Sequence, residues 1–105
     1  MKSQLTVTLV SNLRTAARIV SAVGKVADNG AIEGALIQEH LETVSDHMET
    51  LANELEHMRL YEILTKMETF EAMLDLGSAW EGAGYSAQQI NGFQSLLVTA
   101  KVLLK

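Results

Sequence analysis

Cysteine and proline are both absent from this chain of 105 residues, and only five residues are Phe, Trp or Tyr. The absence of cysteine excludes a disulfide framework and a thiolate nucleophile. The absence of proline removes a common cause of breaks and kinks in helices. No uninterrupted apolar run approaches the ~18 residues of a membrane-spanning helix. We therefore expect a soluble, cytoplasmic protein that does not contact membranes.

Positive charge is also scarce, and it is unevenly placed. Residues 1–27 contain four Lys or Arg and no acid, whereas residues 28–58 contain eight acids and no Lys or Arg. This distribution argues against direct binding of nucleic acid, because phosphate contacts need clustered cations. It favours two neighbouring antiparallel helices whose oppositely charged edges attract each other.

One long segment organises the chain. The stretch from Ala31 to Leu76 contains one glycine, and its apolar residues recur at helical spacing. In its first half an apolar seam alternates intervals of four and three, and it consists of Ile37, Leu41, Val44, Met48, Leu51, Leu55 and Met58. In its second half the seam consists of Leu60, Ile63, Met67, Phe70 and Leu74.

The two seams are out of phase. Their two-residue offset turns the apolar face by about 200° around a helix. No glycine or proline marks the junction, so we expect a continuous helix that changes its packing partner near Met58–Leu60. A kink at the same place is the alternative.

These patterns predict an all-α antiparallel bundle in a single domain, residues 1–105. The long central helix is flanked by an N-terminal helix, within residues 3–27, and a C-terminal helix that follows Ser86. A continuous central helix would be about 70 Å long, and its partners would leave part of the seam uncovered. We therefore expect a homodimer, whereas a kinked helix would permit a compact four-helix monomer. The predicted self-association residues are Leu41, Val44, Met48, Leu51, Leu55, Met58, Ile63, Met67, Phe70 and Leu74.

Short polar or glycine-rich stretches predict the connections. Residues 28–30 form an Asp-Asn-Gly turn signal after the first helix. Ser86 and Gln89 have the spacing of a capping box, which predicts the start of the last helix. Inside that helix, Gly92 suggests close packing against a neighbour.

Two surfaces are candidates for contact with an unidentified protein partner. An acidic stripe runs along the first half of the long segment, and Trp80 and Tyr85 lie in the glycine-rich connection after it. A solvated helix face would also explain the stripe, and a cap on the end of the bundle would also explain the tryptophan. The predicted partner-binding residues are Glu39, Glu42, Asp46, Glu49, Glu56, Trp80 and Tyr85.

Signals for catalysis and for metal binding are weak. Glu54 and His57 match the Glu-x-x-His spacing of di-metal bundles, but the chain has no second such pair. His40, His47 and Glu54 follow one another at intervals of seven residues, so neighbours lie about 10 Å apart, too far to share one ion within a chain. Across a dimer axis, His47 could meet its own copy. We expect no catalytic residues, no metal and no cofactor.

The sequence thus predicts a non-enzymatic, self-associating protein-interaction protein, such as an adaptor, a chaperone or an inhibitor of a larger complex. One alternative is an acidic decoy that imitates nucleic acid and blocks a nucleic-acid-binding protein. A second alternative is a metal-binding helical bundle.

Overall fold

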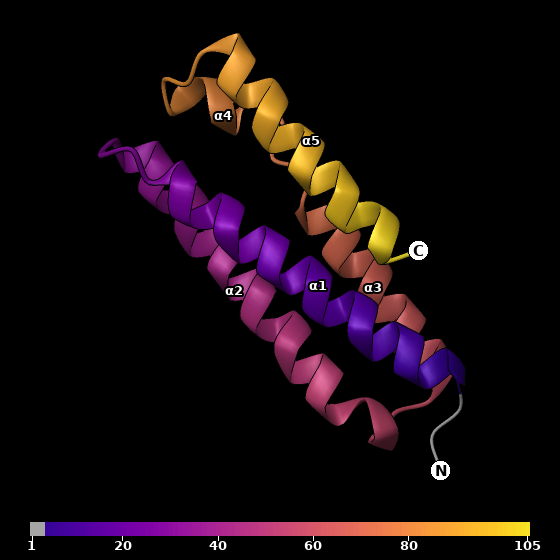
Figure 1. The fold of residues 1–105 in the computed structure, drawn as a ribbon. Coiled ribbons are helices and arrows are strands. Elements are labelled where there is room, and N and C mark those ends of the chain that lie inside the picture. Colours follow the sequence, from indigo (N-terminus) through magenta and orange to yellow (C-terminus); the bar gives the residue numbers. More distant parts are fainter. Residues whose placement is uncertain (1–3) are drawn as a thin grey trace.

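A computed structural model describes residues 4–105 as an all-α bundle. The four long helices run alternately up and down, and α1 packs against both α2 and α5 (Figure 1). The elements in chain order are α1 (Gln4–Ala27), α2 (Ile32–Glu54), the 3-10 turn η1 (Leu55–His57), α3 (Leu60–Met73), the short α4 (Ala79–Gly82) and α5 (Ala87–Leu103). The bundle measures 48 × 20 × 18 Å.

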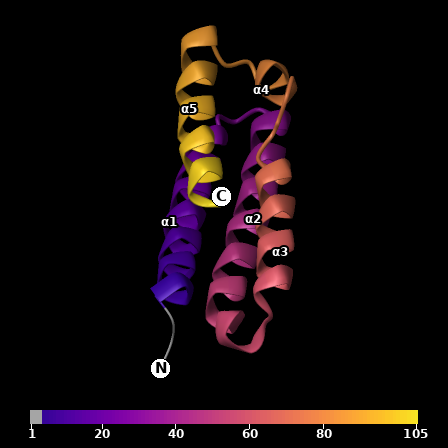
Figure 2. The same cartoon turned by 90° about the vertical axis from the view of Figure 1, so that its right-hand side faces the viewer.

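The expected continuous central helix is wrong, and the alternative kink is in fact a full reversal. After the 3-10 turn, Met58 and Arg59 take extended backbone conformations, with ψ of 149° and 146°. From there α3 returns alongside α2, as Figure 2 shows. The reversal explains the offset between the two seams, because it turns both of them towards the same core. Local composition did not require a break here, and tertiary packing decided it.

Intrachain packing covers the predicted self-association residues. Met58 is partly buried against the core. The other nine are buried in it, namely Leu41, Val44, Met48, Leu51, Leu55, Ile63, Met67, Phe70 and Leu74. A second copy is therefore not needed to cover these seams, and the argument that led to a homodimer no longer applies.

Two glycines let α1 and α2 approach each other closely. A Cβ atom on Gly24 would lie 3.2 Å from the Cβ of Leu41. A Cβ atom on Gly34 would lie only 2.5 Å from the main-chain oxygen of Ala27, which cannot move aside. Further from the turn that joins the two helices, the buried Ser45 donates a hydrogen bond of 2.7 Å to the main-chain oxygen of Ala17.

Aromatic side chains close one end of the bundle. Trp80 is 1% exposed, and its ring stacks on Phe93 with the centroids 4.9 Å apart. Tyr85 meets both rings edge-on. The predicted capping box is confirmed, because Ser86 and Gln89 bond each other's backbone at the start of α5. The expected close packing at Gly92 is wrong, since an added Cβ atom would meet nothing within 4 Å.

Candidate interaction surface

Two hollows follow one face of α2, a lower one between α2 and α3 and an upper one between α2 and the segment formed by Leu76 and α4. We call this face and the helices beside it the α2–α3 seam. α2 contributes residues spaced by three or four to each hollow, so the lining of both hollows lies on one stripe of this helix. Opposite α2, the lower hollow is lined by residues of α3, and the upper hollow is lined by Leu76 and by residues of α4. Both hollows open to the surface where the bundle's own packing is incomplete.

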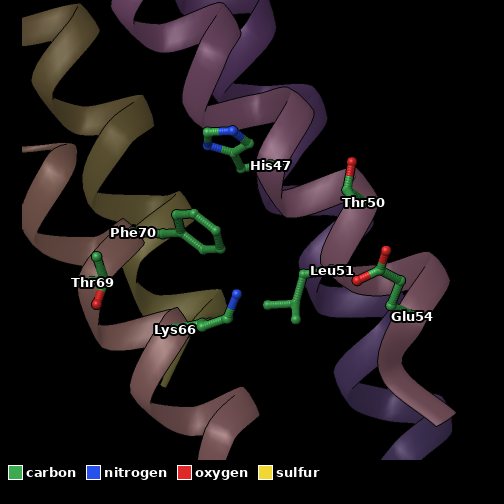
Figure 3. Close-up of a pocket in the computed structure, with 7 residues that line it drawn as sticks. All are labelled: His47, Thr50, Leu51, Glu54, Lys66, Thr69 and Phe70. Atoms are coloured by element: carbon green, nitrogen blue, oxygen red, sulfur yellow. The ribbon is translucent and has the colours of Figure 1, made fainter. Parts of the chain in front are cut away.

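The lower hollow has a volume of about 380 Å³ and combines an apolar floor with a polar mouth (Figure 3). Leu51 of α2 and Phe70 of α3 are the buried members of its lining. Lys66 extends its ammonium group towards the gap between the helices. The remaining lining residues are His47, Thr50, Glu54 and Thr69, all of them exposed.

The upper hollow has a volume of about 270 Å³ and an almost entirely apolar wall. Leu36 on its rim is 58% exposed, and Ile32, one helical turn earlier on α2, is 77% exposed. The wall is formed by Glu33, Leu36, Ile37, His40, Leu76, Ala79 and Gly82. Large aliphatic side chains exposed beside a hollow that reaches the core are typical of a contact surface for another molecule.

One hydrogen bond marks the boundary between the two hollows. The Nε2 atom of His40, on α2, lies 2.9 Å from the main-chain oxygen of Met73, at the end of α3. This oxygen belongs to the last turn of α3, where carbonyl groups lack a partner within the helix. His40 therefore ties α2 to α3 from the surface, and it lies within the stripe that lines the seam.

The predicted acidic stripe does not form one outward face. Glu39 and Asp46 are exposed, whereas Glu42 and Glu49 are half-buried. Glu42 accepts a hydrogen bond from Gln38. The exposed pair lies one row from the seam with α3, and the half-buried pair lies on the side of α1. Glu56 belongs to the 3-10 turn beyond α2 and has His57 as a neighbour, 3.6 Å away.

The two aromatic residues predicted to bind a partner have structural roles in this chain. The ring of Trp80 is enclosed by the core, so the interpretation as a cap on the bundle end is the one that fits its burial. Tyr85 is partly buried, and its hydroxyl donates to the main-chain oxygens of Val26 and Ala27 at the end of α1. Burial raises the pKa of this hydroxyl above its ordinary value of 10.0, and the charge of Asp28 adds to the effect.

The candidate metal residues lie apart from a common site. Glu54 is the last residue of α2, whereas His57 is in the 3-10 turn and faces Glu56. Within residues 4–105 no three His, Asp or Glu side chains are grouped closely enough to hold an ion. The structure instead distributes His40 and His47 along the α2–α3 seam.

Sequence reasoning missed the exposed apolar residues on and beside the rim of the upper hollow. Ile32 and Leu36 are four residues apart, and neither belongs to the seam that begins at Ile37. The four-residue interval between them is the helical spacing of a second apolar face on α2. That interval was the sequence signal that could have identified the interaction surface.

No protein-family model matches this chain, and no curated protein and no solved structure is significantly similar to it. In the part of the chain that the structure describes, no helix is long and apolar enough to cross a membrane.

Proposed function

We propose that the protein is a non-enzymatic protein-interaction module whose contact surface is the α2–α3 seam. The observation that carries the proposal is the exposure of Ile32 and Leu36 beside the upper hollow. Burial of two such side chains by a partner would contribute about 1.5–3 kcal/mol each. An adaptor, a chaperone and an inhibitor all act through a surface of this kind.

The surroundings of these residues support the proposal. Leu36 and Ala79 stand on opposite walls of a hollow whose floor is formed by the buried side chain of Ile37. An apolar side chain from a partner that enters this hollow would therefore make contact with the protein's own core. Contacts in such central, desolvated pockets dominate the affinity of protein interfaces.

The test compares partner capture by two matched double variants. Ile32→Gln with Leu36→Gln removes the apolar rim, and Val7→Gln with Val102→Gln makes the same chemical change at exposed sites on α1 and α5. Each protein is crosslinked in its native cells and captured, after circular dichroism has shown unchanged helix content. We expect one crosslinked protein to be lost with the first variant and kept with the second. Equal capture by both variants would contradict the proposal.

An acidic decoy is the second candidate, and the exposure of Glu39 and Asp46 on α2 favours it. A decoy needs a regular row of outward carboxylates, and two of the four on this helix are instead half-buried on the side of α1. Charge reversal at Glu42, Asp46 and Glu49 would abolish partner binding if the decoy operates. Binding that survives this reversal with helix content intact removes the second candidate.

A further inference from the structure

We infer that the α2–α3 seam accommodates one cationic amphipathic helix of another protein, which lies along the seam and fills both hollows. The inference rests on the proposed function, because it names the chemistry of the partner at the same surface. It follows from the length of the seam, the spacing of its hollows and the charges along it.

The shape of the seam fits a helix. From Glu33 to Glu54 the lining stripe of α2 extends over about 30 Å, which is the length of a helix of about 20 residues. A docked helix presents its anchors at intervals of three, four and seven residues along one line. The two hollows lie along such a line, with apolar floors at Ile37 and at Leu51 with Phe70.

The charges along the seam select a cationic partner. Glu33 and Glu54 line the hollows, and Glu39 and Asp46 are exposed one row further out on α2. Glu62 lies one turn before Lys66 on α3, and Arg59 lies one turn before Glu62, so five carboxylates stand against two cationic side chains along the seam. Lys or Arg on the flanks of a docked helix would meet carboxylates on both sides.

A second copy of the chain fits this surface less well. Its α1 has the required sign of charge, because it carries Arg14, Arg18 and Lys25 and no acid. However, the apolar face of α1 is buried in its own bundle, from Leu13 to Ala27. The α1 helix of a second copy therefore offers charge without the apolar anchors that the hollows need.

The test uses two designed peptides of about 20 residues with the same leucine stripe at helical spacing. One has lysine at all other positions, and the other has glutamate. Each is titrated into the full-length, ¹⁵N-labelled protein, and the amide shifts are mapped at low and at high salt. We expect the lysine peptide to shift amides along α2, α3 and α4 only, and the glutamate peptide to shift none.

Matched charge variants locate the contact. Glu39→Gln with Asp46→Asn neutralises two carboxylates beside the seam, and Glu42→Gln with Glu49→Gln neutralises two on the side of α1. The first pair should raise the dissociation constant of the lysine peptide by about three- to tenfold at low salt, and the second should leave it within about twofold. Leu36→Gln should weaken binding by about tenfold or more at either salt concentration, because it removes an apolar contact that salt does not screen.

Other outcomes separate the two proposals. Shifts of the seam amides with the glutamate peptide alone would overturn the cationic helix and leave the proposed function standing. Shifts of the seam amides that grow with protein concentration, together with a doubled mass, would assign the seam to a second copy and overturn the inference. Nonspecific attraction would show itself in one of two ways: the lysine peptide would also shift amides over α1, or both pairs of charge substitutions would weaken its binding equally. Either result would overturn the inference. Absence of any seam shift, together with equal capture by the Ile32 and Leu36 variant, would remove both proposals.

Discussion

The hydroxyl oxygen of Tyr85 lies 2.8 Å from the main-chain oxygen of Val26, a residue 59 positions earlier in the chain. The same hydroxyl also lies against the main-chain oxygen of Ala27, so its single proton is shared between two carbonyls at the end of α1. These carbonyls belong to the last turn of α1, where no later N–H group of the helix is available to donate to them. Tyr85, which directly precedes the N-cap residue of α5, thus bonds the start of α5 to the last turn of α1.

Replacement of Tyr85 by Phe keeps the ring contacts with Trp80 and Phe93 and removes only the hydroxyl. We expect the free energy of unfolding to fall by about 1 kcal/mol, the usual net contribution of such a hydrogen bond. Urea unfolding followed by circular dichroism measures the change. Tyr61→Phe is the control, because Tyr61 is 78% exposed on α3. If Tyr85→Phe lowers the free energy of unfolding by no more than Tyr61→Phe does, the hydroxyl bonds of Tyr85 contribute no net stability.

The raised pKa of Tyr85 makes part of the stability depend on alkaline pH. The folded state favours the neutral hydroxyl, chiefly through burial and then through the charge of Asp28. Its contribution is complete below the ordinary pKa of 10.0 and is lost as pH rises through the higher folded pKa. The difference in unfolding midpoint between wild type and Tyr85→Phe should therefore shrink between about pH 8 and about pH 11. A constant difference across this range would contradict the assignment.

Two glycine-to-alanine substitutions should have opposite effects. Gly34→Ala forces a methyl group against the Ala27 oxygen and should destabilise the fold by about 1–3 kcal/mol. Gly92→Ala adds a methyl group in open space within α5 and should stabilise it by up to about 1 kcal/mol, because alanine is the better helix former. Thermal unfolding of the two variants compares them directly. A neutral Gly34→Ala would mean that α1 and α2 are less tightly apposed.

Burial of the apolar seams within one chain sets an expectation for mass in solution. We expect light scattering to report 11.5 kDa, the mass of one chain, across a concentration series. A stable dimer at low concentration would point to an exposed contact, and Ile32→Gln with Leu36→Gln would then be tested for its effect on the mass. A dimer that this variant does not dissociate would use another surface.

The helices were predictable from residue spacing, whereas the path of the chain between them was not. The seams around Leu41 and Met67 were read correctly as apolar faces, and both are buried. The phase change at Met58 was visible too, but a continuous and a reversed chain satisfy the same local preferences. The reversal is favoured by burial of both seams in one core, which is a property of the whole bundle.

The candidate surface was less predictable, because it depends on how far apart two helices lie. Lys66 and Glu54 come from opposite sides of the reversal, and the spacing of residues does not reveal that they line one hollow. Trp80 shows the converse problem. Its glycine-rich neighbourhood was compatible with a cap on the bundle end and with a partner contact, and the enclosure by Tyr85 and Phe93 that favours the cap depends on tertiary packing.

The cross-links at the two ends of the bundle are unequal. At the end where α1 meets α2, Tyr85 bonds to Val26, and the Asn29 side chain donates a hydrogen bond of 2.8 Å to the main-chain oxygen of Ala83. The opposite end is formed by the 3-10 turn and the extended residues Met58 and Arg59, and one side-chain bond, from Arg14 to Asn53, joins α1 to the last turn of α2 there. Local opening starts where the fewest contacts resist it, so amide hydrogens near this turn should exchange with solvent before those of the α1–α2 hairpin. The protein should then come apart in a set order, with α3 released first and the paired hairpin of α1 and α2 last.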